Sequence, residues 1–169
     1  DLAIQAALTG HLVFSTLHTS NAAGALPRLL DLGAENFLLA STMTALLGQR
    51  IVRTICNACK ESYIPPQQLV EEIKKVLGPL FPKDAGETKF YKGKGCSECG
   101  GNGYLGRVGI FETLPITSKI SQLILQHPDS DTIEKEAMSD GMITMKQDGY
   151  LKVLQGVTTI EEVLRVAQE

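Results

Sequence analysis

Two short cysteine motifs decide how the middle of this chain folds: Cys56-Asn57-Ala58-Cys59 and, 36 residues further on, Cys96-Ser97-Glu98-Cys99. Two such pairs can place four thiolates in a tetrahedron around one ion, each about 2.3 Å from it. Four sulfur ligands with no open coordination position favour Zn²⁺ in a structural role. Glycines crowd around the second pair, and glycine tolerates the backbone angles that tight turns need. The sequence therefore predicts a structural zinc site.

The cysteines also have alternative uses. No stretch has the form of a secretory signal, so a disulfide framework is not expected. Free structural cysteines and a redox-active pair remain the alternatives to a metal site. The 36-residue spacer is longer than in common zinc ribbons, but the cost of closing a loop rises only slowly with its length.

Length and charge narrow the class of protein. The chain has 169 residues, enough for one domain or one domain with a small module. Sixteen basic and 19 acidic side chains give a net charge of −3, which provides no overall field for binding nucleic acid. No uncharged apolar run reaches the length of a transmembrane helix. The sequence therefore favours a soluble protein with no nucleic-acid partner.

The residues before the first cysteine pair follow an α/β pattern. Gly10 is placed to stop a first helix, and Thr19, Ser20 and Asn21 are types that begin one. We expect helices over residues 2–9, 20–32 and 35–47, and strands over 11–17 and 50–55. The segment from 56 to 106 is rich in proline and glycine and carries one expected helix, at 67–77.

The residues after the second cysteine pair begin with an expected strand at 107–114 and then become helical. Expected helices cover 119–126, 132–139, 144–155 and 159–168. Thr159-Ile160-Glu161-Glu162 has the spacing of a capping box, in which the first and last residues satisfy backbone groups at a helix start.

Two histidines lie at the two ends of the expected strand over 11–17. His18 follows the carboxyl end, and in α/β folds ligands bind at that edge of the sheet. An imidazole there can hydrogen-bond a phosphate oxygen and titrates near neutral pH. His11 lies at the opposite end. The bland alternative for both is a histidine that only packs or is solvated.

Three segments together resemble the secretion traffic ATPases. Residues 3–19 resemble the family's His box, and the same similarity continues through residues 48–56 and 103–112. The paired cysteine motifs point to the branch that extends pili or drives type II secretion. Against the family pattern, Gly48 replaces an alanine and Ile51 a leucine.

The resemblance implies a fold: the C-terminal part of a RecA-like, P-loop ATPase core, with an inserted four-cysteine zinc module and an α-helical C-terminal subdomain. The expected segments are 1–55 for the core with the His box, 56–106 for the zinc module, and 107–169 for a return strand and the helical subdomain.

The resemblance also implies a homo-hexameric ATPase in the bacterial cytoplasm, peripheral at the inner membrane. Its partners would be the inner-membrane platform and cytoplasmic components of a pilus or secretion machine. The phosphate-loop motif and the family's acidic boxes are absent. We therefore expect a C-terminal portion of such an enzyme, inactive alone, with ATP and Mg²⁺ bound only by the intact enzyme.

The resemblance assigns roles to particular residues. His18 would sense the nucleotide γ-phosphate, and His11 is the other histidine of the box. Arg107 would reach a nucleotide or a subunit interface, although a plain surface role on its strand fits equally. The metal ligands would be Cys56, Cys59, Cys96 and Cys99.

A second resemblance supports a different class of function. The run Cys96-x-x-Cys99-x-Gly101-x-Gly103 is similar to the zinc repeat of Hsp40 co-chaperones. That family carries several such repeats, whereas this chain has one, and its first cysteine pair lacks the glycines. The alternative function is therefore a zinc-stapled binding module without catalysis.

Overall fold

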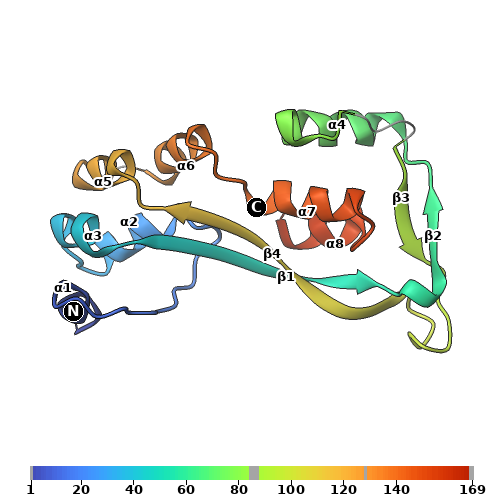
Figure 1. The fold of residues 1–169 in the computed structure, drawn as a ribbon, viewed down its shortest axis with the longest axis horizontal. Helices are drawn as coiled ribbons and strands as arrows, with labels where there is room; N and C mark the ends of the chain where they lie inside the picture. The colour runs from blue at the N-terminus through green and yellow to red at the C-terminus, as the bar shows by residue number, and fades with distance from the viewer. Residues whose placement is uncertain (1, 84–87, 128, 168–169) are drawn as a thin grey trace. The chain divides into compact units, whose positions relative to one another are not determined.

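The computed structural model describes residues 2–83, 88–127 and 129–167, and it contains eight α-helices and four strands in these ranges (Figure 1). The helices are α1 (Leu2–Leu8), α2 (Ala25–Asp31), α3 (Asn36–Thr42), α4 (Gln67–Leu77), α5 (Ser118–Leu125), α6 (Ser130–Ser139), α7 (Met145–Leu154) and α8 (Ile160–Ala167). The strands are β1 (Ala45–Ile55), β2 (Lys60–Tyr63), β3 (Phe90–Gly93) and β4 (Tyr104–Pro115). The chain is therefore a mixed α/β protein, as expected.

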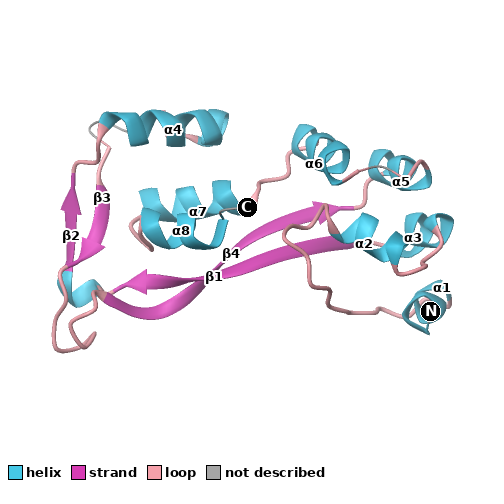
Figure 2. Ribbon diagram, turned by 180° about the vertical axis from the view of Figure 1, so that it is seen from behind, coloured by secondary structure: helices cyan, strands magenta, loops and turns pink. Residues whose placement is uncertain are grey.

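The strands form two separate two-stranded sheets, which Figure 2 distinguishes from the helices by colour. In one, β2 pairs antiparallel with β3, with Lys60 opposite Gly93. In the other, β1 pairs with β4, and their arrows point in opposite directions in Figure 1. The Ile116 amide donates to the Thr44 carbonyl at one end of this pair, over 2.9 Å. The long β1–β4 ribbon is thus antiparallel.

The chain divides into two compact units, each made of two stretches of sequence. Unit 1 is Asp1–Gly48 with Glu112–Thr144, and unit 2 is Gln49–Phe111 with Met145–Glu169. Two of the three boundaries fall within β1 and β4, and the third lies directly before α7, so each unit contains part of the ribbon. The contiguous segments expected from the sequence (1–55, 56–106 and 107–169) stay a prediction.

The core of unit 1 joins helices to the end of β4. Leu114 on β4 is fully buried together with Leu39 of α3 and Ile120 of α5. Ile120 and Ile124 are four residues apart and so lie on one face of α5. Thr117 caps this helix by accepting a hydrogen bond from the Ile120 amide. The expected helix at 119–126 is therefore confirmed, with a cap that sets its start.

The core of unit 2 forms around the last two helices and α4. Tyr150 and Val153 of α7 are buried against Val163 of α8, and Ile73 of α4 belongs to the same cluster. The expected helices at 67–77, 144–155 and 159–168 are confirmed within one or two residues at each end. In α4 and α8 the apolar residues repeat every three or four positions, which is the pattern that a helix buries on one face. The buried positions of α7 lie on more than one face and include Gln147 and Gly149.

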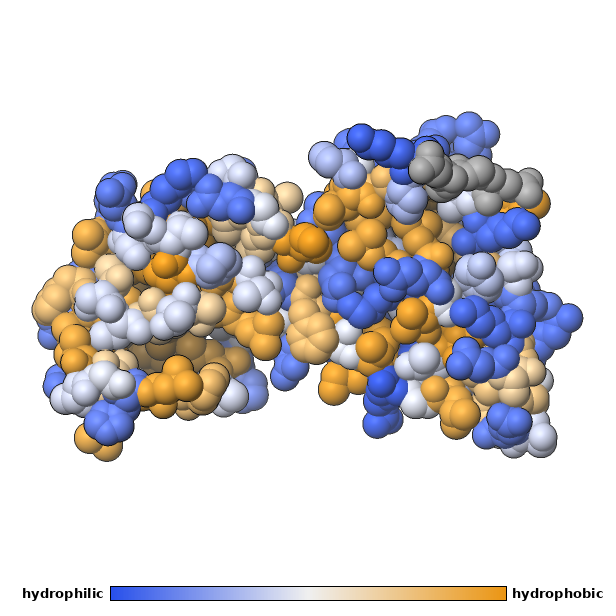
Figure 3. Space-filling view, in the orientation of Figure 1, coloured by the Kyte–Doolittle hydropathy of each residue, from blue (hydrophilic) through white to orange (hydrophobic). Residues whose placement is uncertain are grey.

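The expected strand over 11–17 is wrong. Residues 11–17 have no regular structure, and neither of the sheets formed by the described residues includes them. Leu12 and Phe14 are 81% and 87% exposed, and Figure 3 shows that apolar side chains reach the surface in several places. An apolar run becomes a strand only when a neighbouring strand satisfies its backbone, and this part of the described chain has none beside it.

Two expected helices are shorter than their sequence pattern indicated. The helix over 35–47 ends as α3 at Thr42, because Met43 is extended and β1 begins at Ala45. Pairing with β4 overrides the helical propensity of Ala45-Leu46-Leu47. The helix over 20–32 is α2, Ala25–Asp31, and Gly33 ends it with φ +88°.

A test of this packing is the glycine in the middle of α7. Replacing Gly by Ala in the middle of a helix normally stabilises the helix by up to about 1 kcal/mol. A Cβ at Gly149, however, would lie 2.6 Å from Val163 Cγ1. We expect Gly149→Ala to lower the free energy of unfolding by about 1–3 kcal/mol in urea titrations, because the buried valine cannot give way.

The matched control removes the obstacle. In a Val163→Ala background, Gly149→Ala should be neutral or stabilising, since only helix propensity then acts. A stabilising effect of Gly149→Ala in the native background would contradict this account of the α7–α8 contact.

Candidate metal centre

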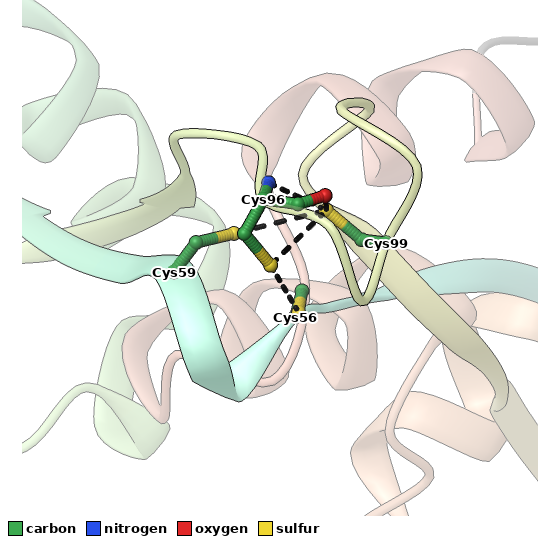
Figure 4. A group of neighbouring side chains, drawn as sticks. All are labelled: Cys56, Cys59, Cys96 and Cys99. Atoms are coloured by element: carbon green, nitrogen blue, oxygen red, sulfur yellow. Dashed lines mark hydrogen bonds between the residues drawn. The ribbon is translucent and has the colours of Figure 1, made fainter.

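The four cysteines come from two places in unit 2. Cys56 follows the last residue of β1, and Cys59 ends the short 3₁₀ turn Asn57–Cys59 before β2. Cys96 and Cys99 lie in the loop between β3 and β4. Figure 4 shows the four side chains converging from these segments.

The sulfur positions fit a tetrahedral metal site. The ligand atoms all lie within 4.8 Å of one another. The Sγ–Sγ distances are 3.8 Å for Cys56–Cys96, 3.9 Å for Cys59–Cys99 and 3.7 Å for Cys96–Cys99. Four sulfurs placed tetrahedrally at about 2.3 Å from one ion would be about 3.8 Å apart. A disulfide needs about 2.05 Å, so the cysteines are free thiols, and this donor set suits Zn²⁺.

Backbone amides donate hydrogen bonds to the cysteine sulfurs and stabilise the conformation of the two cysteine motifs. The Gly95 amide donates to Cys59 Sγ over 3.3 Å, and the Gly103 amide donates to Cys99 Sγ over 3.3 Å. Gly103 has φ +79°, and a Cβ there would lie 2.5 Å from the Gly93 carbonyl oxygen. Glycine is therefore required at Gly103 for both conformation and space. These amide donors stabilise thiolates, which are the form that binds metal.

The pKa values of the thiols differ with their surroundings. Burial raises the pKa of Cys59 to about 12 and also raises the pKa of Cys56. The Cys96 amide, aided by the Gly103 amide, lowers the pKa of Cys99 to about 6 against the effect of burial. The pKa of Cys99 is thus below those of Cys56 and Cys59, and its thiol ionises more readily than theirs. A bound cation would favour deprotonation of the others, because ligation requires thiolates.

The other predicted site residues form no such cluster. Among the described residues, the four cysteines are the one group of His, Cys, Asp or Glu side chains that could share a metal ion. His18 and His11 are exposed in the irregular segment after α1, where His11 Nδ1 lies 2.9 Å from Thr9 Oγ1. Arg107 is exposed on β4. Since residues 11–17 form no strand, His18 does not stand at a strand edge here, and its role stays a prediction.

Glu112 is a residue that the sequence reasoning missed. Its side chain is 5% exposed, and its carboxylate accepts the Ala22 amide, at the turn that leads from His18 into α2. Ile110, Glu112 and Leu114 are all buried, so Glu112 lies on the inward face of β4. The sequence signal for Glu112 is a charged residue at a position where the alternation of the strand predicts a buried apolar side chain.

Glu162 is expected from the sequence only as part of a capping box. The Glu162 amide does donate to Thr159 Oγ1, over 3.4 Å. Its carboxylate, however, accepts bonds from the Arg53 amide and guanidinium, both over 2.8 Å, and from Arg165. We call Glu162, Arg53 and Arg165 the ion-pair cluster. It ties α8 to β1, with Glu162 only 1% exposed.

The ion-pair cluster predicts a component of acid sensitivity. Burial alone would raise the pKa of Glu162, but hydrogen bonds from Arg165 and Arg53 outweigh it and lower the pKa to about 2. The stabilisation is therefore present above about pH 4.3, the ordinary pKa of glutamate, and is lost as the pH falls towards 2. It should be on the order of 2 kcal/mol.

The measurement is the free energy of unfolding between pH 5 and pH 2. Glu162→Gln should flatten this part of the profile, because the amide cannot titrate. Glu161→Gln is the control, since Glu161 is exposed on the same helix, and it should keep the native profile. Equal slopes for the native protein and Glu162→Gln would refute the assignment.

Comparison of the sequence with known proteins identifies the family of this chain. A family model described as "Type II/IV secretion system protein" matches residues 1–165. The chain belongs to this family of secretion and pilus proteins, as the resemblance of its motifs indicated.

Particular relatives narrow the position within the family. The chain is 43% identical to type II secretion system protein E of Pseudomonas aeruginosa, over 100% of the chain and 32% of that protein. It is 39% identical to the type IV pilus assembly ATPase PilB of the same organism, over 100% of the chain and 29% of the relative. The chain thus spans about a third of the length of these curated relatives.

The fold is also shared with a solved structure. The Legionella pneumophila ATPase DotB matches with a TM-score of 0.57 over 96% of this chain and 33% of DotB, at 17% identity. This similarity concerns the fold alone.

Within the described ranges, no helix has both the length and the apolar character needed to cross a membrane.

Proposed function

We propose that this chain is part of an ATP-hydrolysing motor for type II secretion or type IV pilus assembly, and that its four cysteines hold a structural zinc ion. The observation that carries the proposal is the match to type II secretion protein E along the whole chain, which includes residues that form a four-sulfur cluster of tetrahedral dimensions.

The metal would act as a cross-link between two loops. Bound Zn²⁺ contributes folding free energy and leaves no open position for catalysis when four thiolates surround it. Cys56 and Cys59 would tie the end of β1 to the loop that carries Cys96 and Cys99. This supports a structural role for residues 56–106, the proposed zinc module.

The motor proposal assigns the remaining residues by analogy with the family. Residues 1–55 and 107–169 would complete a RecA-like core and a helical subdomain in a homo-hexamer. The assembly would work in the bacterial cytoplasm, against the inner-membrane platform of the machine. Phosphoryl transfer depends on a phosphate-binding loop and on Mg²⁺ for positioning and charge stabilisation. Neither a phosphate-loop motif nor an acidic box is present in this chain, so it should not hydrolyse ATP alone.

The alternative of a zinc-stapled binding module without catalysis has less support. It rests on the single repeat around Cys96 and Cys99, whereas the family match covers residues 1–165. Both proposals share the metal centre, so ATP hydrolysis by the intact protein separates them.

The metal proposal predicts one zinc ion per chain. Elemental analysis of protein purified without chelator should give a zinc-to-protein ratio near one, and Cys96→Ser should reduce it strongly. Hydrogen exchange should then become faster across residues 56–106, because metal binding and local folding are coupled. Residues of unit 1 should be protected as before.

Ser97→Ala is the matched control, since Ser97 is exposed between the two cysteines of its motif. It should retain the metal. A native protein with no zinc and four freely reactive thiols would end the proposal.

The motor proposal predicts a specific effect of His18. In the intact protein that contains this chain, His18→Ala should reduce the rate of ATP hydrolysis by about tenfold or more, as expected when a donor to a transferred phosphate is lost. Folding and zinc content should be nearly unchanged, because the side chain is exposed in this structure.

His11→Ala serves for comparison and should cost less activity, since His11 contacts Thr9 at the end of α1. If His18→Ala lowered thermal stability while turnover per folded molecule stayed native, His18 would be a packing residue and the sensing role would be wrong.

A further inference from the structure

The start of α8 is attached to the strand that delivers the first cysteine. The Ile55 amide donates to the Val157 carbonyl over 3.0 Å, and Thr158 Oγ1 donates to the Arg53 carbonyl over 2.7 Å. Thr158 is fully buried. Since Cys56 follows Ile55 directly, the backbone that enters the metal centre is held in place by the residues before α8.

The same end of α8 also holds the strand that leaves the second cysteine pair. Tyr104 Oη lies 2.9 Å from Thr159 Oγ1. The residue before it, Gly103, donates its amide to Cys99 Sγ and accepts the Cys56 amide with its carbonyl over 3.0 Å. One ligand from each motif is therefore supported by a strand end that α8 contacts.

The ion-pair cluster adds a third connection between α8 and the two strand ends. Arg53 bonds to the buried Glu162 carboxylate of α8 through both its amide and its guanidinium. The guanidinium also lies over the Tyr104 ring, 4.1 Å from its centroid. Glu162 thus acts on β1 directly and on β4 through the Arg53–Tyr104 stack.

We propose that Glu162 and Tyr104 are positioning residues of the metal centre, which couple zinc binding to the docking of α8. The inference rests on the proposed metal site and adds to it a carboxylate, Glu162, that lies far beyond Cys99 in the sequence. If α8 is docked, the strand ends hold Cys56 and Cys99 ready for the ion. Because coupling between two sites is reciprocal, bound zinc must in turn stabilise α8.

The test compares zinc affinities in the intact protein by competition with a chromogenic chelator. Glu162→Gln should weaken zinc binding about 10-fold or more, the usual range for residues that orient metal ligands. Tyr104→Phe removes only the hydroxyl that contacts Thr159 and should weaken binding by a smaller factor. It also keeps the test decisive if Glu162→Gln does not fold.

Two controls separate positioning from general stability. Glu161→Gln changes an exposed carboxylate on the same helix and should bind zinc as the native protein does. Ile120→Val alters the buried face of α5 in the core of unit 1, which includes no residue of α8, and it should lower stability without changing zinc affinity. In the native protein, zinc should also slow amide exchange in α8.

The outcomes are distinct. Native zinc affinity in Glu162→Gln, or in Tyr104→Phe if Glu162→Gln does not fold, would overturn the coupling and leave the metal site standing. The same loss of affinity in Ile120→Val would also overturn it, since the effect would then be one of general stability. A native protein that binds no zinc would overturn the metal site itself.

Discussion

The antiparallel pairing of β1 with β4 is the constraint on which the other features depend. One end of the ribbon is closed by the bond from Ile116 to Thr44, and the other by the bond from Cys56 to Gly103. Along its length the ribbon supplies Leu114 to the core of unit 1 and Val52 and Ile110 to a core of unit 2. A two-stranded ribbon is marginal in water by itself, so burial of its alternating side chains by the helices is what maintains it.

Two buried carboxylates lie where this ribbon meets other elements, and each has amide or guanidinium donors. Glu112 accepts the Ala22 amide before α2, and Glu162 accepts three groups at the start of α8. Buried charge is costly unless such donors compensate it. The two acids therefore specify where loops and helices join the strands, and hydrophobic packing alone would leave these joints less well determined.

The sequence predicted local features well where one short stretch contains all the information. The helices α4, α5 and α8 follow apolar repeats of three to four residues, and Gly10 and Gly33 end α1 and α2 with positive φ. The sequence-based prediction failed where pairing with a strand distant in the sequence determines the secondary structure. Residues 11–17 have a strand's composition but no neighbouring strand among the described residues, while Ala45-Leu46-Leu47 form a strand because β4 lies beside them.

By itself, the sequence predicted four candidate sulfur ligands, the periodicity of several helices and the family, because motif spacing and residue type are properties of the chain alone. Only the tertiary structure decided that the sulfurs converge to between 3.7 and 3.9 Å for the three hydrogen-bonded pairs, and that Glu162 reaches Arg53 across 109 positions of sequence. The physical reason is that these contacts form when β1 and β4 pair and α8 docks on them. No local pattern encodes which distant backbone groups will then meet.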